Sequence, residues 1–146
     1  MKVLFVCKGN VGRSQIAEAV FNKLSKHKSF SAGIEVNENE GQKIKDIPLA
    51  NLVIKSMKKE GIDISENTRK QFKLESIPKF DKIIVMAERE SVPKYLLNRQ
   101  NVEFWDIKNP NGVTSEEHDK IVEQIKNLVE EFIKKNNLTS SNAIRL

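Results

Sequence analysis

The chain has 146 residues, of which 38% are hydrophobic and 31% charged, and its formal net charge is +5. This length suits one domain that can bury a core without disulfides or metal, and the composition excludes a disordered chain. No apolar run is long enough for a transmembrane helix, and the N-terminal apolar stretch is too short for a signal peptide. The single cysteine excludes an internal disulfide and indicates a cytoplasmic protein.

The excess of lysine and arginine favours anionic partners, such as phosphorylated or acidic substrates. Nucleic acid is the competing partner, but the lysines are scattered and no basic stripe is interleaved with aromatic residues. We therefore expect neither nucleic-acid nor membrane binding, and we expect most lysines to form a solvated surface.

The N-terminal part of the chain alternates apolar runs with helical patterns. Residues 2–6 predict a buried strand, and apolar residues at helical spacing predict a helix over 14–26. Residues 30–32 predict a second strand, which Gly33 ends. The polar residues 34–47 are expected to form an exposed loop.

The middle of the chain continues this alternation. Proline and glycine bracket a second helix over residues 48–60, because proline suits a first turn and glycine follows a helix end. Residues 82–86 predict a third buried strand and residues 89–98 a short helix. A fourth strand is expected over 102–105, and residues 106–112 have turn-forming composition.

The C-terminal helix is the clearest predicted element. Thr114 and Glu117 form a capping-box pattern, and apolar residues then recur at helical spacing to about residue 135. Residues 1–136 are expected to form one domain, and the polar residues 137–146 a C-terminal tail that frays. Strands that alternate with helices predict a parallel sheet covered on both faces.

The only cysteine, Cys7, follows the first predicted strand directly, at the edge of a parallel sheet where ligands bind. Gly9 and Gly12 allow the loop after Cys7 to turn its N–H groups inward around an anion, and the N-terminus of the following helix adds positive charge. Arg13 supplies a two-pronged donor set for phosphate oxygens. These donors favour the thiolate form of Cys7, which can attack phosphorus and form a covalent intermediate.

The whole loop is expected to contact the substrate, through Lys8, Gly9, Asn10, Val11, Gly12 and Arg13. Ser14 is expected in the first turn of the following helix or at its cap, with its hydroxyl hydrogen-bonded to the thiolate, while the Asn10 amide braces the loop from within. The opposing interpretation is that Cys7 is only a small buried hydrophobic residue. Strand, glycine loop, arginine and helix occurring together favour the catalytic interpretation.

Residues 7–14 read CKGNVGRS, are followed by QIAEA, and resemble the low-molecular-weight protein tyrosine phosphatase family, which shares its fold with thioredoxin-coupled arsenate reductases. Residues 31–33, 61–64, 83–86 and 105–112 are also similar, so the resemblance covers nearly the whole chain. It implies a three-layer α/β sandwich with a four-stranded parallel sheet flanked by helices, a flavodoxin-like, phosphotyrosine phosphatase I-like fold. It also implies that no metal and no organic cofactor take part.

The resemblance places the family's general acid, an aspartate followed by proline, at Asn109-Pro110 in this chain. An amide cannot donate a proton as a general acid, and losing one lowers a rate by on the order of a hundredfold to ten-thousandfold. Asp106 could substitute if its loop folds inward, whereas the alternative is a solvated turn residue. Substrates with good leaving groups should suffer least.

Two further positions differ from the family. Asn111-Gly112 occupies the place of a tyrosine that lines the substrate slot in relatives, and the only tyrosine, Tyr95, is expected to pack within a helix. Gly12 replaces a second loop cysteine of many relatives, so Cys7 cannot be protected by a disulfide within the loop. The lone cysteine also excludes arsenate reduction by an internal relay, but reduction with an external thiol, such as a glutaredoxin-type partner, stays open.

Other polar residues are given lesser roles. His27 and His118 are expected at the surface, so that a metal site is not expected. Arg69 and Gln71 match a stretch near the active site of relatives, and the resemblance implies a structural hydrogen-bonding role for them.

The sequence therefore predicts a cytoplasmic, monomeric, cysteine-dependent phosphatase for a phosphorylated protein or a small phosphomonoester, with phosphotyrosine as the expected group. Cys7 is the expected nucleophile, Arg13 the phosphate clamp, and the loop amides stabilise the equatorial oxygens. The alternatives are an arsenate reductase that uses an external thiol or redox protein, and a phosphate-binding module with weak turnover.

Overall fold

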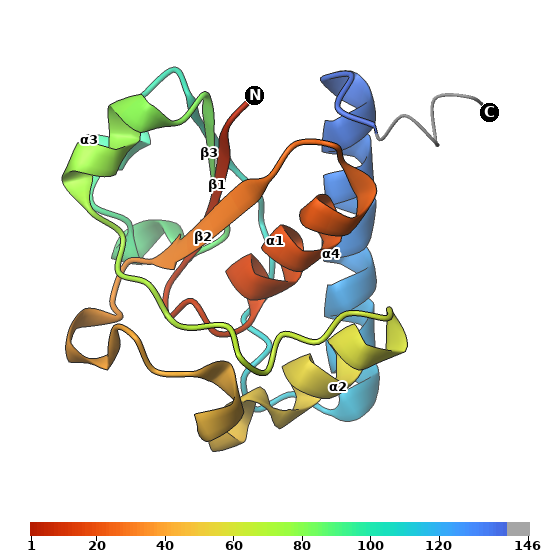
Figure 1. The fold of residues 1–146 in the computed structure, drawn as a ribbon. Helices are drawn as coiled ribbons and strands as arrows, with labels where there is room; N and C mark the ends of the chain where they lie inside the picture. The colour runs from red at the N-terminus through yellow and green to blue at the C-terminus, as the bar shows by residue number, and fades with distance from the viewer. Residues whose placement is uncertain (140–146) are drawn as a thin grey trace.

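A computed structural model describes residues 1–139. The helices and strands follow one another as β1 (Val3–Cys7), α1 (Arg13–Leu24), β2 (Ser29–Gly33), α2 (Asn51–Lys59), β3 (Lys82–Val85), α3 (Lys94–Leu97), β4 (Val102–Phe104) and α4 (Ser115–Lys135). The strands form one parallel sheet in the order β2-β1-β3-β4. Figure 1 shows α1, α2 and α4 on one face of the sheet and α3 on the other. The predicted three-layer α/β fold is confirmed.

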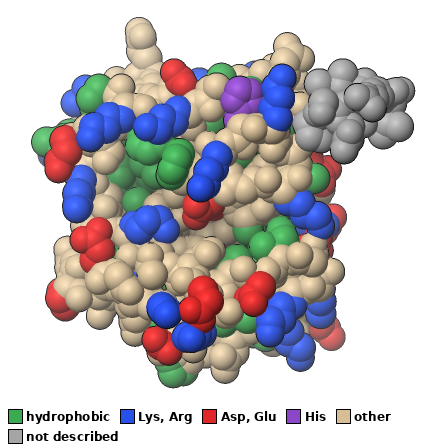
Figure 2. All heavy atoms as spheres, viewed as in Figure 1, with side chains coloured by type: hydrophobic (Ala, Val, Ile, Leu, Met, Phe, Trp, Pro, Cys, Tyr) green, Lys and Arg blue, Asp and Glu red, His purple; other side chains and the backbone are tan. Residues whose placement is uncertain are grey.

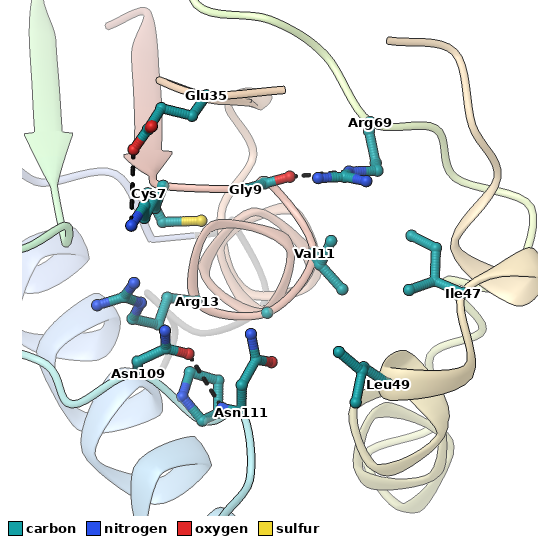
Figure 3. Close-up of a pocket in the computed structure, with 13 residues that line it drawn as sticks. Cys7, Gly9, Val11, Arg13, Glu35, Ile47, Leu49, Arg69, Asn109 and Asn111 are labelled. Carbon is teal, nitrogen blue, oxygen red and sulfur yellow. Dashed lines mark hydrogen bonds and ion pairs between the residues drawn. The ribbon is translucent and has the colours of Figure 1, made fainter. Parts of the chain in front are cut away.

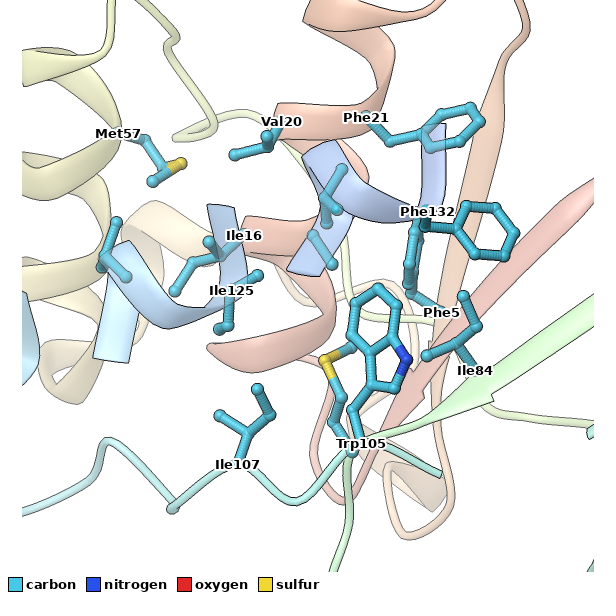
Figure 4. Packing of buried hydrophobic residues seen from close by; sticks show 14 of the residues in the cluster. Phe5, Ile16, Val20, Phe21, Met57, Ile84, Trp105, Ile107, Ile125 and Phe132 are labelled. Carbon is cyan, nitrogen blue, oxygen red and sulfur yellow. The ribbon is translucent and has the colours of Figure 1, made fainter. Parts of the chain in front are cut away.

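Aromatic side chains fill the centre of the larger core, between the sheet and the helices α1, α2 and α4 (Figure 4). Phe5 of β1 lies 5.9 Å from Phe21 and 6.0 Å from Trp105, measured between ring centroids. Phe132 of α4 contacts the same two rings at 6.4 and 6.3 Å. Buried aromatic pairs of this kind contribute about 0.5–1.5 kcal/mol each beyond their area burial. These contacts anchor β1, whose last residue is Cys7, against α1 and α4.

The central strand β1 presents Cys7 at the edge of the sheet where α1 begins. All five residues of β1 are buried, and the strand pairs with β2 on one side and β3 on the other. Cys7 is aligned with Gly33 of β2. Because the carboxyl ends of parallel strands share one edge, the loop after Cys7 lies where ligands bind in such sheets.

Gly33 leaves no room for a side chain beside this loop. A Cβ atom there would lie 2.7 Å from Cγ2 of Val36, 2.8 Å from the main-chain nitrogen of Asn10 and 2.9 Å from the carbonyl carbon of Gly9. We expect Gly33→Ala to lower the free energy of unfolding by about 1–3 kcal/mol, because main-chain atoms must shift to accept the methyl group. Phosphate affinity should fall with it. Denaturant unfolding and a phosphate titration check this; wild-type values for both would show that the contact is not tight.

The region between β2 and α2 is more compact than the sequence predicts. Most of residues 34–47 are exposed, as predicted, but two short 3₁₀ turns form within them, at Asn37–Asn39 and Ile44–Asp46, and Val36 and Ile44 are buried. The helix predicted over residues 48–60 begins only at Asn51, after a third 3₁₀ turn. This segment therefore forms a fixed wall beside the loop edge of the sheet.

The helix predicted over residues 89–98 is interrupted. A 3₁₀ turn covers Arg89–Ser91, and α3 has only four residues. Pro93 is the cause, because a residue before proline is disfavoured in the helical region, and Val92 is extended with φ −86° and ψ 128°. Tyr95 on α3 is 41% exposed, so the prediction that it packs inside the protein is wrong.

Helix α4 begins at the predicted cap. The N–H group of Glu117 donates to Oγ1 of Thr114 over 3.1 Å. The carboxylate of Glu117 does not complete the capping box, because it accepts from the Thr114 hydroxyl and pairs with Lys108 at 3.2 Å. Among the helices of residues 1–139, none is long and apolar enough to cross a membrane.

The chain after α4 returns to the end of α1. The hydroxyl of Ser25 donates to the carbonyl of Leu138 over 2.6 Å, and the side chain of Leu138 is buried. Leu138 of the predicted tail is therefore packed, not frayed. Residues 140–146 of that tail lie outside the described residues.

His118 is buried between α4 and α2, which corrects the prediction of a surface histidine. Its side chain is 1% exposed, and its Nδ1 atom lies 3.1 Å from Oγ of Ser56. Its Nε2 atom has no hydrogen-bond partner among residues 1–139. Burial lowers the pKa of His118 because an imidazolium is poorly solvated there, and Asp119 opposes this only in part.

We expect the protein to lose stability as the pH falls below the ordinary histidine pKa of 6.5, because the unfolded chain then binds a proton that folded His118 does not. The effect is limited to about 1.4 kcal/mol per pH unit. Unfolding by denaturant from about pH 7.5 to about pH 5.5 measures it. His118→Asn cannot bind the proton but can still bond Ser56, and it should flatten the pH dependence. The same slope in both proteins would assign the effect to another group.

Candidate functional site

The loop between β1 and α1 turns its carbonyl groups outward and its N–H groups inward. Asn10 adopts the left-handed region with φ 55°, which is uncommon outside glycine. The carbonyl groups of residues 7–9 accept hydrogen bonds of 2.9–3.0 Å from outside the loop, donated by Ile34, Glu35 and Arg69. Within residues 1–139, no protein group accepts a hydrogen bond from the main-chain N–H groups of residues 8–13. These donors are oriented as in an anion-binding nest.

Cys7 lies at the base of this loop and is 2% exposed. Its Sγ atom is 3.0 Å from Oγ of Ser14. The Asn10 side-chain amide donates to that same Ser14 oxygen over 2.8 Å and to Oγ of Ser31 over 3.0 Å. Because Ser14 already accepts a bond from Asn10, its own proton is free to point at the sulfur of Cys7.

Of the two places predicted for Ser14, the first turn of the helix is confirmed and the cap position is not. Gly12 occupies the cap position, and Ser14 lies buried within the first turn of α1. The hydroxyl is therefore available to Cys7. The other part of the expectation, Asn10 bracing the loop from within, agrees with the hydrogen bonds described above.

Arg13 is 3% exposed and is held by an acidic partner. Its NH1 atom donates to Oε1 of Glu88 and to the carbonyl of Ile107, both over 3.0 Å. Burial opposes ionisation of Glu88, but a main-chain hydrogen bond and Arg13 outweigh it, so the pKa of Glu88 lies below its ordinary value. These contacts use NH1 alone, and the remaining guanidinium donors can contact an oxyanion.

The loop opens into a cavity with a volume of about 440 Å³ (Figure 3). Val11, Ile47 and Leu49 form an apolar side, and the Leu49 side chain is 68% exposed. Figure 3 shows Asn109 and Asn111 beside Arg13, apart from this apolar side. The cavity thus joins an anion-binding floor to an apolar wall.

The loop that carries Asn109 closes over the Cys7 loop. Asn109 lines the cavity, and its Oδ1 atom accepts from the N–H of Asn111 over 3.0 Å. A Cβ atom on Gly12 would lie 2.8 Å from Cγ of Pro110. The absence of a side chain at Gly12 is what allows Pro110 to approach so closely.

Asp106 is not brought to the site. It is exposed and lines a different cavity, on the far side of the Arg13–Glu88 pair from the one that contains Cys7. The structure therefore gathers Cys7, Arg13 and Asn109 around one cavity and leaves Asp106 outside it.

Sequence reasoning missed Ile47 and Leu49 as residues that line the cavity. Both come from the segment of 3₁₀ turns before α2, and their only signal was an apolar side chain in a polar stretch. Gln71 has the structural role that the resemblance implied. It accepts from the N–H groups of Val36 and Asn37 over 2.8 and 2.7 Å.

Charge at the surface is mixed. Figure 2 shows Lys and Arg side chains spread over the viewed face with Asp and Glu between them, and no continuous basic stripe crosses this face. At the cavity, Lys8 pairs with Glu35 at 3.6 Å. Within residues 1–139, no three His, Cys, Asp or Glu side chains are grouped so that they could hold a metal ion.

The family model described as low molecular weight phosphotyrosine protein phosphatase matches residues 2–142. Arsenate reductase 1 of Staphylococcus epidermidis is 29% identical over 134 residues, which cover 89% of this chain and 93% of that protein. Glutaredoxin arsenate reductase of Synechocystis sp. is 30% identical over 137 residues, covering 92% and 97%. The crystal structure of low molecular weight protein tyrosine phosphatase from T. tengcongensis is 29% identical, covers 92% of this chain and 99% of its own, and has a TM-score of 0.77.

Proposed function

The chain belongs to the low molecular weight phosphotyrosine protein phosphatase family, and we propose that it hydrolyses phosphotyrosine or a related phosphomonoester through a phosphorylated Cys7. One observation carries the proposal: Cys7 lies under a ring of main-chain N–H groups that have no acceptor among residues 1–139. Arg13 reaches the same cavity. A tetrahedral oxyanion supplies acceptors for all of these donors at once.

In the first step the Cys7 thiolate attacks phosphorus, and the bond from phosphorus to the ester oxygen breaks. Ser14 supports the thiolate through the 3.0 Å contact between Oγ and Sγ. The loop N–H groups and Arg13 stabilise the charge that is spread over the equatorial oxygens. The leaving oxygen departs with the bonding electron pair and takes a proton from solvent, because Asn109 cannot donate one.

In the second step water attacks phosphorus, the sulfur–phosphorus bond breaks, and inorganic phosphate and the Cys7 thiolate are released. The Ser14 hydroxyl stabilises the departing thiolate as it did the attacking one. Because no side chain at the leaving group supplies a proton, turnover should depend strongly on the acidity of the leaving alcohol.

A second candidate is arsenate reduction with an external thiol, favoured by the 30% identity to the glutaredoxin arsenate reductase of Synechocystis sp.. Cys7 would attack arsenic and displace water, and the external thiol would then attack the Cys7 sulfur. Arsenic(V) leaves as arsenic(III), and the two electrons come from the two sulfurs, which end as a mixed disulfide. The chain has one cysteine, so the second thiol must be external.

Paired assays on one preparation decide between these functions. The protein is given p-nitrophenyl phosphate and a phosphotyrosine peptide, and separately arsenate with glutathione and a glutaredoxin. We expect hydrolysis of the phosphate esters, fastest for p-nitrophenyl phosphate because p-nitrophenolate is a good leaving group. Arsenite formation without ester hydrolysis would establish the reductase. Phosphate binding without either reaction would establish a binding module.

A further inference from the structure

Arg69 is a cation on the cavity wall whose charge has no carboxylate partner in residues 1–139. The two other cations that line the cavity are both paired. Lys8 lies 3.6 Å from Glu35, and Arg13 lies 3.0 Å from Glu88.

Neutral acceptors hold Arg69 in a fixed position. Its Nε atom donates to the carbonyl of Gly9 over 3.0 Å, and its NH1 atom donates to Oε1 of Gln42 over 2.9 Å. Its main-chain N–H and carbonyl are also bonded, to Gln42 and Gly41. The guanidinium is therefore preorganised and keeps its full charge, with donors left over for an anion.

Nearby carboxylates are occupied by other cations. Glu66 pairs with Lys43 and Lys45 at 3.0 and 2.6 Å, and Glu40 pairs with Lys73 at 3.9 Å. An incoming anion therefore does not have to displace a carboxylate from Arg69.

Arg69 contacts the outer, carbonyl side of the Cys7 loop. It bonds the carbonyl of Gly9, and the loop carbonyls point away from the ring of N–H groups. Figure 3 shows Arg69 on the same side of the cavity as Ile47, with Val11 between these residues and Arg13. A substrate that places its phosphate in the loop and its body along the apolar wall passes Arg69.

We infer that Arg69 selects phosphorylated peptides with an acidic side chain next to the phosphorylated residue, and this inference rests on the proposed function. The carboxylate receives the free Arg69 donors while the phosphoryl group occupies the loop. An ion pair at such a partly exposed position changes affinity by roughly twofold to fivefold, and salt screens it.

Binding to a Cys7→Ser protein tests this without turnover. Two phosphotyrosine peptides are compared by calorimetry at low salt, one with Glu and one with Gln on both sides of the phosphotyrosine. We expect the Glu peptide to bind about twofold to fivefold more tightly. A further Arg69→Gln substitution should remove the difference, because Gln can still donate to Gly9 but has no charge. Lys26→Gln removes one charge from an exposed position beyond the far end of α1, and it should leave the difference intact.

The outcomes separate a failed inference from a failed function. Equal affinities for both peptides, no binding of either, or a preference that persists in Arg69→Gln overturns the role of Arg69. An equal loss for both peptides in Arg69→Gln also overturns it, because that result marks a brace for the loop. A preference that depends on Arg69, in a protein that hydrolyses neither peptide, supports the inference and rejects the phosphatase.

Discussion

Cys7→Ser is expected to abolish turnover of p-nitrophenyl phosphate, by about ten-thousandfold or more, while phosphate binding persists. The serine hydroxyl is far less ionised than a thiol at neutral pH and is a poor nucleophile. The N–H groups that would hold the oxyanion belong to the main chain, which the substitution leaves in place. Steady-state kinetics and a phosphate titration measure the two effects on one sample.

The matched control is Ser14→Ala, which keeps the thiol and removes the hydroxyl 3.0 Å from it. It should lower turnover without abolishing it, since a charge-assisted hydrogen bond contributes about 1.5–3 kcal/mol. Full phosphatase activity in Cys7→Ser would refute the mechanism proposed here.

Asn109→Asp is expected to raise turnover of substrates with poor leaving groups by on the order of a hundredfold. The two side chains have the same shape, and aspartate can accept the same bond from the N–H of Asn111. The new carboxyl would line the cavity beside Arg13, where the leaving oxygen departs. A series of aryl phosphates with leaving groups of rising pKa measures the effect as a flattened dependence of kcat on leaving-group acidity.

Asp106→Asn is the control for this gain. Asp106 lines the separate cavity, so its loss should change neither the rate nor its dependence on the leaving group. A strong loss of activity in Asp106→Asn, or no gain of activity in Asn109→Asp, would contradict this expectation. Either result would mean that the loop that carries Asp106 and Asn109 moves when substrate binds.

The fold and the centre of the candidate site could be predicted because their signals are local. The strand, the glycine loop, Arg13 and the start of α1 occupy consecutive residues, so spacing alone places the nucleophile beside its donors. The break of the helix at Pro93 also had a local signal, in the restriction that proline imposes on Val92.

The cavity walls could not be predicted from local signals because their position depends on long-range contacts, and only the resemblance placed Arg69 near the site. Arg69 reaches the site through its bond to Gly9, which is 60 residues away in the sequence. Leu49 is placed by the 3₁₀ turns before α2, which show no regular period. His118 lies among charged neighbours, and only the packing of α4 on α2 reveals that it is buried.

The close fit of Pro110 against Gly12 also fixes how this enzyme can respond to oxidants. The Cβ atom of a side chain at position 12 would lie 2.8 Å from Cγ of Pro110. A second thiol at this position would therefore need the space that Pro110 fills. A residue with a Cβ atom at this position would require Pro110 to shift. With Gly12 in place the pocket stays compact and Cys7 has no second thiol in the chain, so its recovery after oxidation depends on reductants supplied by the surroundings.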